Sequence, residues 1–303
     1  MPIYISVIIP SLNRPAALER SLNSVLVQDT QGEFKYEIIA VLDKQDEESE
    51  AWLKRRSLMD SRINVYRSLR TGVNSARNLG IKKSQGEVIY FLDDDCSTPD
   101  KNLLRNLSGC FKGYPEASAI GGGYLLGKGE KDIFNISRNG LDNFYIEAYL
   151  SFNGMAGSLL GGNTAYKKEV FAKYGYFDEQ IRYGSAETEL NDRILKGGGK
   201  LYYIKELSVL HSPVNKNIIA YCLGSFRQGR GKAYSIAKNG RVDIPLQSKP
   251  GRLWFMRIAT NLKVNLPHRI LSALFLVAVS LCFHTGLLLS KMRRFDGDYK
   301  QAL

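Results

Sequence analysis

Short apolar runs alternate with amphipathic segments through the first hundred residues. The runs at 5–9, 36–42, 63–66 and 88–92 are rich in β-branched and aromatic side chains, as is typical of strands buried on both faces. We expect the first strand to end at Pro10. The segments between them, 16–28, 47–59 and 73–83, are predicted to be helices. Strict alternation with short connections predicts an α/β fold with a mostly parallel sheet flanked by helices.

Polar segments follow each predicted strand. They are residues 11–14, 43–46, 68–74 and 93–95. Ligands of open parallel sheets bind beyond the carboxyl ends of the strands, so these segments are the first candidates for a binding site.

The middle of the chain, about 115–212, is richer in glycine. Gly121-Gly122-Gly123 and Gly161-Gly162-Asn163 indicate sharp turns or places where the backbone approaches a ligand closely. Residues 187–195 are predicted to be a helix with acids in its first turn. Three glycines at 197–199 end it.

A long uncharged segment lies near the end of the chain. Residues 270–290 are 21 positions without Asp, Glu, Lys or Arg, and basic residues flank both ends. That length matches the roughly 20 residues that cross a bilayer. His284, Thr285 and Gly286 weaken its hydropathy, and a soluble core helix is the alternative. We expect a helix that associates with a membrane, either spanning it or lying on it.

The formal net charge of +12 belongs to the C-terminal third. Residues 213–269 hold eleven Lys or Arg and one acid, whereas residues 1–212 carry 27 bases and 27 acids. This imbalance predicts an anionic partner, either a lipid surface or a nucleic acid. No nucleic acid is expected, because the basic stretch has no recognisable binding fold and no aromatic platform.

The cysteines and the first residues bear on the compartment. Cys96, Cys110, Cys222 and Cys282 are far apart, which disfavours a zinc cluster or a disulfide framework and favours a reducing compartment. Residues 1–6 show no basic segment followed by an apolar run and a cleavage site, so no signal peptide is expected.

Three adjacent acids follow the strand at 88–92. Asp93, Asp94 and Asp95 repel one another unless a cation is present, and hard oxygens suit magnesium or manganese holding a diphosphate. The alternative is a solvated acidic turn that caps the next helix. A dinucleotide-binding domain is disfavoured, because Pro10 to Arg14 is not a glycine-rich phosphate loop.

Seven motifs run through the first 210 residues in one order. They are residues 6–14, 41–43, 74–80, 91–95, 162–171, 175–179 and 187–193, and His211 follows them. In their residues, order and spacing they resemble glycosyltransferase family 2. The resemblance implies a GT-A fold with a Rossmann-like sheet, inverting transfer from a nucleotide-diphosphate sugar, and a manganese or magnesium cofactor.

The resemblance also implies roles for individual residues. The expected nucleotide-binding residues are Pro10, Ser11, Asn13, Asp43, Arg77, Asp93 and Asp94, the metal ligands are Asp93, Asp95 and His211, and the acceptor-binding residues are Gly161, Gly162 and Asn163. Alternatives stay open for several of them. Asp43 would otherwise cap the helix after it, and Arg77 would otherwise form an ion pair with the acid triplet. His211 would otherwise be a structural histidine, and Gly161, Gly162 and Asn163 would otherwise serve packing.

The catalytic base is where the sequence departs from the family pattern. The usual motif is Glu-Asp-x-Asp-Leu, whereas this chain has Ala186 first, Glu187 second and Glu189 fourth. We expect Glu187 to take the proton of the acceptor hydroxyl, with Glu189 as the second candidate. The alternative is that both acids only favour the helix N-terminus.

The sequence therefore predicts a GT-A catalytic domain over 1–212, divided near 114 into a nucleotide-binding half and an acceptor-binding half, and a basic helical region over 213–303. The expected function is metal-dependent transfer from a nucleotide sugar, UDP-linked, to a glycan or lipid-linked acceptor at the cytoplasmic face of a membrane. The alternatives are a nucleotidyltransferase, which would need a glycine-rich basic loop after the first strand, and a catalytically inactive glycan-binding relative.

Overall fold

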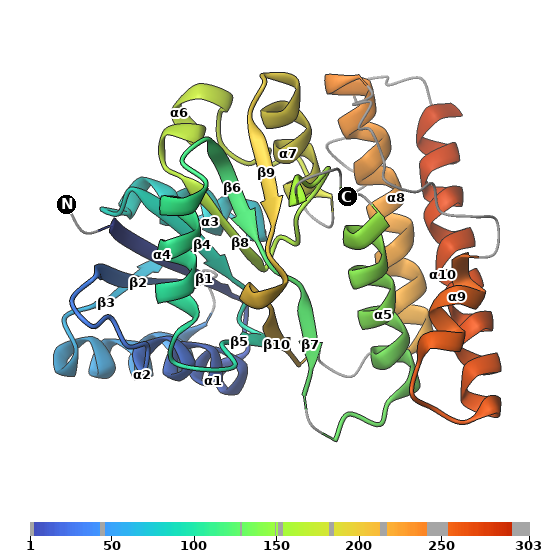
Figure 1. Cartoon of the computed structure of the whole chain (residues 1–303), viewed down its shortest axis with the longest axis horizontal. Helices are drawn as coiled ribbons and strands as arrows, with labels where there is room; N and C mark the ends of the chain where they lie inside the picture. Colours follow the sequence, from blue (N-terminus) through green and yellow to red (C-terminus); the bar gives the residue numbers. More distant parts are fainter. Residues whose placement is uncertain are drawn as a thin grey trace.

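The computed structural model describes residues 3–42, 46–127, 129–148, 150, 154–181, 185–212, 217–240 and 254–292. Within them, seven strands form one sheet in the order β3-β2-β1-β4-β8-β6-β9. The strands are β1 (Ile3–Ser11), β2 (Phe34–Leu42), β3 (Ile63–Arg67), β4 (Val88–Leu92), β6 (Ala117–Gly121), β8 (Asn163–Lys167) and β9 (Lys200–Tyr203). Only β8 runs antiparallel to its neighbours, which confirms the mostly parallel sheet (Figure 1).

Helices cover both faces of this sheet. They are α1 (Pro15–Leu26), α2 (Glu47–Met59), α3 (Val73–Lys83), α4 (Leu103–Gly113), α6 (Glu169–Tyr174) and α7 (Ala186–Lys196). One core cluster packs α1, α2 and α4 against the sheet, and a second packs α3, α6 and α7 against the other face. The predicted helices at 47–59 and 73–83 and the strand at 88–92 have the predicted bounds.

The first strand is longer than predicted, because it does not end at Pro10. β1 pairs with β4 only from Ile5 to Ile8, whereas it pairs with β2 as far as Ser11. Beyond Ile8, the side of β1 that faces β4 is no longer paired. No hydrogen bond on that side therefore requires a backbone N–H from β1. Proline, which has no N–H, is tolerated there.

A small second sheet lies at the carboxyl edge of the large one. It joins β5 (Cys96–Ser97), β10 (Val209–His211) and β7 (Tyr124–Leu126) in the order β5-β10-β7. β10 pairs with β5 in antiparallel register, with His211 opposite Cys96. A 3-10 turn, Lys205–Leu207, leads into β10. Residues from three distant parts of the chain thus meet beside the acid triplet.

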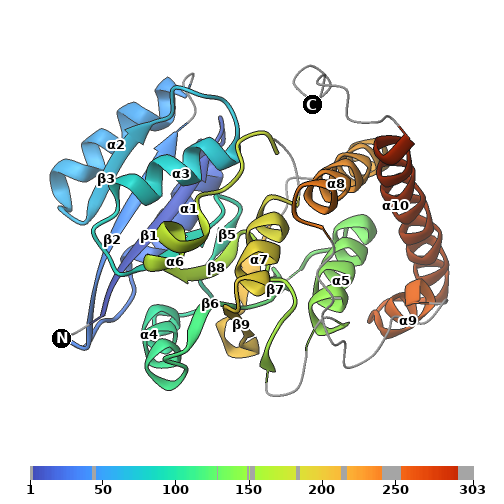
Figure 2. The same cartoon turned by 90° about the horizontal axis from the view of Figure 1, so that it is seen from above.

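Four helices form a layer beside the sheet: α5 (Ile133–Ala148), α8 (Ile218–Asn239), α9 (Trp254–Asn261) and α10 (Leu266–Met292) (Figures 1 and 2). Leu141, Tyr221, Ile258 and Phe275, one from each helix, are buried in a third core cluster. The chain segment predicted as the acceptor half thus contributes α5 to the C-terminal helices. The domain bounds at 114 and 212 stay predictions.

Helices α8 and α10 pack through glycine. A Cβ added at Gly229 of α8 would overlap the carbonyl oxygen of Phe283, and one added at Gly286 of α10 would overlap the carbonyl oxygen of Phe226. Each helix therefore presents bare backbone to the other at the crossing. Small residues at a helix crossing allow this close approach, as in membrane helix pairs.

Helix α10 is the long uncharged segment of the sequence. Leu266–Ser290 is long and apolar enough to cross a membrane, with a mean hydropathy of 2.1 over an 18-residue window that is 28% buried. Phe275, Leu276 and Val279 face the protein core, whereas Leu274 and Leu281 are each 63% exposed. The helix therefore has one face packed on the protein and one apolar face on the surface.

The glycine crossing predicts a contrast between two substitutions in α8. Gly229→Ala should lower the free energy of unfolding by about 1–3 kcal/mol, because the methyl group overpacks the α8–α10 contact. Gly224→Ala should raise it by up to about 1 kcal/mol, since nothing lies within 4 Å of the new Cβ and alanine is the better helix former. Urea unfolding midpoints measure both. Equal effects of the two substitutions would contradict the close crossing.

Candidate active site

The acid triplet after β4 is joined to the end of β1. The Ser11 hydroxyl donates to Asp94 Oδ2 at 2.8 Å. Arg14 Nη1 lies 3.1 Å from Asp94 Oδ1 and 3.2 Å from Asp95 Oδ2. Arg14 was not predicted as a site residue. Its signal in the sequence is its position directly after Pro10 to Asn13, at the carboxyl end of the first strand.

Asp94 is buried within this group. Burial raises the pKa of its carboxyl group to about 6, although the Arg14 charge and the Ser11 hydrogen bond act in the opposite direction. Both carboxylate oxygens accept hydrogen bonds from the β1 side of the site. In this structure Asp94 therefore holds the 11–14 loop, and its predicted contact with a nucleotide stays a prediction.

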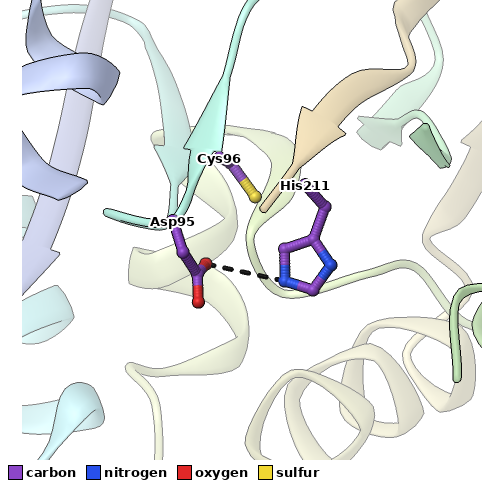
Figure 3. A group of neighbouring side chains, drawn as sticks. All are labelled: Asp95, Cys96 and His211. Carbon is purple, nitrogen blue, oxygen red and sulfur yellow. Dashed lines mark ion pairs between the residues drawn. The ribbon is translucent and has the colours of Figure 1, made fainter. Parts of the chain in front are cut away.

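Asp95 and His211 form a pair that suits a divalent cation. His211 Nε2 lies 3.6 Å from Asp95 Oδ1, and both side chains are partly exposed. The pairing of β10 with β5 sets this distance, together with a hydrogen bond from the Ser212 N–H to the Asp95 carbonyl oxygen. Figure 3 shows the two side chains facing each other, with Cys96 beside them.

The donor atoms here fit magnesium or manganese. The ligand atoms of Asp95, Cys96 and His211 all lie within 4.8 Å of one another. A carboxylate oxygen and an imidazole nitrogen are suitable ligands for manganese, and such sites use few protein ligands because substrate phosphates and water complete the shell. The Cys96 thiol is a less suitable third ligand, because soft sulfur donors suit zinc or copper better than magnesium or manganese.

Asp93 has a different partner from Asp95 and His211, and its predicted role as a metal ligand stays a prediction. Its Oδ1 accepts a hydrogen bond from Arg77 Nη2 at 2.9 Å. Arg77 is 3% exposed, and its guanidinium group stacks over the rings of Phe91 and Phe177. The ion pair with the triplet, which is the alternative for Arg77, is therefore present in the structure, and its predicted nucleotide contact stays a prediction. The buried guanidinium of Arg77 thus holds the Asp93 carboxylate in place.

Glu187 lies beside this ion pair. A Cβ added at Gly161 would lie 3.0 Å from Glu187 Oε2 and 3.2 Å from Arg77 Nη1. A Cβ at Gly162 would overlap the Asp93 carboxylate. The two glycines therefore leave room for both carboxylates to approach the same stretch of backbone. This close packing explains the residue type at 161 and 162, and their acceptor-binding role stays a prediction.

The electrostatic environment of Glu187 suits a proton acceptor. Burial raises the pKa of its carboxyl group, while Arg77 and the N-terminal backbone of α7 lower it. The net pKa stays above the ordinary value of 4.5. Burial lowers the pKa of Arg77, but Asp93 and Glu187 together raise it further, so the guanidinium stays charged. A carboxylate of raised pKa beside a fixed cation is a stronger base than a free glutamate.

Glu189 contacts other partners than Glu187 does, and its role as the second catalytic candidate stays a prediction. It is fully buried, and its oxygens accept hydrogen bonds from Arg193 at 2.9 and 2.8 Å and from Asn239 at 3.0 Å. Lys238 Nζ lies 3.3 Å away. Two positions along a helix correspond to about 200°, so Glu187 and Glu189 lie on opposite faces of α7. Glu189 ties α7 to α8.

The side chain of Asn163 is also hydrogen-bonded within the protein. Its amide donates to the carbonyl oxygens of Gly123 and Leu207 at 3.0 and 2.9 Å, and its oxygen accepts from the Tyr90 hydroxyl at 2.9 Å. Its side chain is 1% exposed. Asn163 thus holds β8 to the segment before β10, and its predicted contact with an acceptor stays a prediction.

The remaining predicted residues lie around the end of β1. Pro10 and Ser11 are buried in the last positions of that strand. Asn13 is exposed with φ of 50°, and its N–H donates to Asp46, the N-cap residue of α2. Asp43 lies outside the described residues. The nucleotide-binding roles of these four residues stay predictions.

Tyr124 is a site residue that the sequence reasoning missed. Its ring stacks on His211 with centroids 4.5 Å apart, and its hydroxyl accepts from the Gly162 N–H at 3.2 Å. It thus links the candidate metal ligand to the glycine pair beside Glu187. No local pattern distinguishes it, because only the pairing of β7 with β10 brings it there.

The profile of glycosyl transferase family 2 matches residues 6–175, more than half of the chain. The chain belongs to glycosyltransferase family 2. This confirms the resemblance that the sequence motifs indicated. The matched range contains the β1 end, the acid triplet and the glycine pair, and stops before α7.

Two curated relatives are similar to part of the chain. Glycosyltransferase AglE of Haloferax volcanii is 34% identical over 106 residues, which is 35% of this chain and 34% of the relative. The GalNAc(5)-diNAcBac-PP-undecaprenol beta-1,3-glucosyltransferase of Campylobacter jejuni is 33% identical over 94 residues, 30% of this chain and 29% of the relative. The matches thus span about a third of each relative.

Two solved structures share the fold. Mannosyltransferase PcManGT from Pyrobaculum calidifontis, solved in complex with GDP-Man and Mn2+, matches with a TM-score of 0.61 at 15% identity. The match covers 96% of this chain and 74% of the mannosyltransferase chain. GalNAc-T7 with UDP, GalNAc and Mn2+ matches with a TM-score of 0.58 at 18% identity. This match covers 78% of this chain and 50% of the GalNAc-T7 chain. The family's GT-A fold is therefore confirmed for this chain.

The Asp95–His211 pair predicts a metal effect that can be separated from folding. His211→Ala should weaken the manganese-dependent binding of UDP by at least about tenfold, because one donor of the site is lost. His268→Ala, on the exposed start of α10, is the matched control and should bind like wild type. Calorimetric titrations with UDP and with GDP, each with and without manganese, measure this. Equal affinities for the two variants would contradict the metal site.

Proposed function

We propose that this protein transfers a sugar from a nucleotide-diphosphate sugar, UDP-linked as the sequence predicts, to a hydroxyl group of a glycan or lipid-linked acceptor, with inversion at the anomeric carbon. The observation that carries the proposal is the position of Glu187. Its carboxylate lies beside the Arg77–Asp93 pair, and the glycine pair and Tyr124 link that group to Asp95 and His211.

The chain's own residues supply the proton transfer. Glu187 accepts the proton of the acceptor hydroxyl while the hydroxyl oxygen forms its bond to the anomeric carbon. The bond from that carbon to the diphosphate oxygen breaks on the opposite side, and the nucleoside diphosphate leaves with the electron pair. Arg77 keeps Glu187 ionised between turnovers through its charge.

A divalent metal would be held by Asp95 and His211. When bound, manganese or magnesium supplies positive charge that stabilises the departing diphosphate. The two structural neighbours were solved with manganese and with a GDP-sugar or UDP, which supports a metal and a nucleotide donor. Arg14, beside Asp94 and Asp95, brings a further positive charge to the same end of the sheet.

The proposal places the protein at the cytoplasmic face of a membrane. The exposed apolar face of α10 supports it, as does the excess of basic residues over 213–269. The Campylobacter jejuni relative is named for an undecaprenol-linked substrate, which supports a lipid-linked acceptor. An amphipathic helix with basic residues near it is attracted to anionic lipid.

The role of Glu187 is tested by its amide. Glu187→Gln should lower kcat by about 10²–10⁴-fold, the usual contribution of a positioned base, while nucleotide and metal affinity stay at the wild-type level. Exposed Glu206→Gln is the matched control. Glu189→Gln should lower the unfolding midpoint, because it weakens a buried ion pair, and leave kcat close to wild type.

The pH profile adds a second readout. Since the base must be ionised, wild-type kcat should fall as the pH decreases through the Glu187 pKa, at a midpoint above 4.5. The residual activity of Glu187→Gln should lack this acidic limb. A wild-type rate for Glu187→Gln would overturn its assignment as the base.

The exposed face of α10 predicts lipid binding. Replacing both Leu274 and Leu281 by Glu should abolish co-sedimentation with phosphatidylglycerol vesicles, because each charge would have to enter the interface. The matched control is Leu58→Glu with Met59→Glu at the end of α2, where the side chains are 89% and 83% exposed. If both double variants lost vesicle binding to the same extent, the result would contradict a membrane interface on α10.

A further inference from the structure

A cavity of about 700 Å³ lies between α7 and the helical layer. Its walls come from α5, α7, α8 and α10, from Trp254 at the start of α9, and from the segment before the glycine pair. In Figure 2, α7 lies next to the sheet and α10 on the far side of the layer, so these walls span the width of the layer. The volume falls within the roughly 300–1,000 Å³ of small-molecule sites.

One wall of the cavity carries the candidate base. Glu187 lines it together with Ser185 and Thr188 from the start of α7. Ser185 is held against α8, because its hydroxyl donates to the Gln228 carbonyl oxygen at 3.1 Å. A molecule in the cavity would therefore reach the carboxylate that faces Arg77 and the glycine pair.

Most of the remaining lining is apolar. Leu141 and Tyr145 come from α5, Trp254 from α9, Ile236 from α8, and Val279 and Phe283 from α10. These are aliphatic and aromatic groups that gain free energy when they cover hydrocarbon in place of water. They belong mostly to the helices outside the range that the family profile matches.

The charged groups of the lining are paired with each other. Arg138 lies 3.0 Å from Asp142, and Lys232 lies 3.0 Å from Asp192. Their charges are thus balanced within the protein. Apart from Glu187, the cavity does not present a net charge that would select an anionic ligand, and hydrophobic contact is its main means of selection.

The cavity also meets the helix that carries the exposed apolar face. Ser280 and His284 of α10 line it, and the exposed Leu281 lies between them in the sequence. Val279 and Phe283 of the same helix line the cavity beside them, so α10 offers apolar contact inside the cavity as well as on its exposed face. Apolar contact of this kind suits a lipid chain better than a soluble oligosaccharide, which needs hydrogen-bonding partners along its length.

We propose that this cavity binds the hydrocarbon chain of a lipid-linked acceptor, with the hydroxyl-bearing sugar of that acceptor at Glu187. The inference rests on the proposed function for the role of Glu187. The α5–α8–α10 layer then selects the acceptor through its lipid, while the sheet edge holds the donor.

The test uses n-dodecyl β-D-glucoside below its micelle-forming concentration and Trp254 as the reporter. The chain has two tryptophans, so Trp52→Phe leaves Trp254 as the single emitter, inside the cavity wall. Dodecyl glucoside should shift Trp254 emission with a Kd at least about tenfold lower than methyl β-D-glucoside, because only the former carries a chain for the cavity.

Two variants of α10 locate the binding. Ser280→Phe adds a ring in the cavity and should raise the Kd for dodecyl glucoside at least about tenfold. Thr285→Phe adds the same ring outside the cavity lining and should leave the Kd within about twofold of wild type. Both are compared at equal helix content by circular dichroism. If Ser280→Phe does not fold, Ile236→Phe narrows the same cavity from α8.

Equal Kd values for the cavity variant and Thr285→Phe would overturn the proposal, because binding would then lie on the outer face of α10. Tighter binding of maltopentaose than of dodecyl glucoside would also overturn it, in favour of a soluble glycan. The titration contains no donor and measures no transfer. A wild-type rate for Glu187→Gln would therefore refute the base and leave the cavity result standing.

Discussion

The ion pair of Arg77 with Asp93 is the interaction on which the site depends. Arg77 is buried under Phe91 and Phe177, so its charge needs a partner, and Asp93 supplies it at the end of β4. Removing the Asp93 carboxylate would leave the buried Arg77 charge without this partner, which is destabilising. The pair fixes the end of the central strand relative to α3. It also sets the potential that Glu187 experiences on α7, because the same guanidinium lies beside both carboxylates.

In this arrangement each acid of the triplet has its own contacts. Asp93 turns toward Arg77, Asp94 holds the β1 loop through Ser11 and Arg14, and Asp95 faces His211. The three adjacent carboxylates thus have different sets of partners, and Arg14 contacts both Asp94 and Asp95. Two of these partners are cations, which reduces the repulsion within the triplet while leaving Asp95 beside the imidazole of His211.

The helical layer contributes a core of its own and a wall of the cavity. Its core is built from α5, α8, α9 and α10, and the glycine crossing of α8 with α10 brings their backbones together. The layer forms the wall of a cavity that Glu187 also lines. The proposed donor end and the proposed acceptor end therefore meet at the first turn of α7, where Glu187 and Glu189 face in opposite directions.

The sequence alone determined the alternation of strands and helices, the family, and the acid triplet at a strand end. These follow from local periodicity and from short motifs whose residues are neighbours along the chain. Only the tertiary structure decided that Glu187 faces the site while Glu189 binds α8, and that Asp95 and not Asp93 meets His211. It also decided that Asn163 is occupied by the fold, that Tyr124 joins the site, and that α5 packs with the C-terminal helices. Helical spacing shows that two side chains lie on opposite faces of α7, but which face meets the ligand depends on the packing of distant segments. No local pattern encodes that packing.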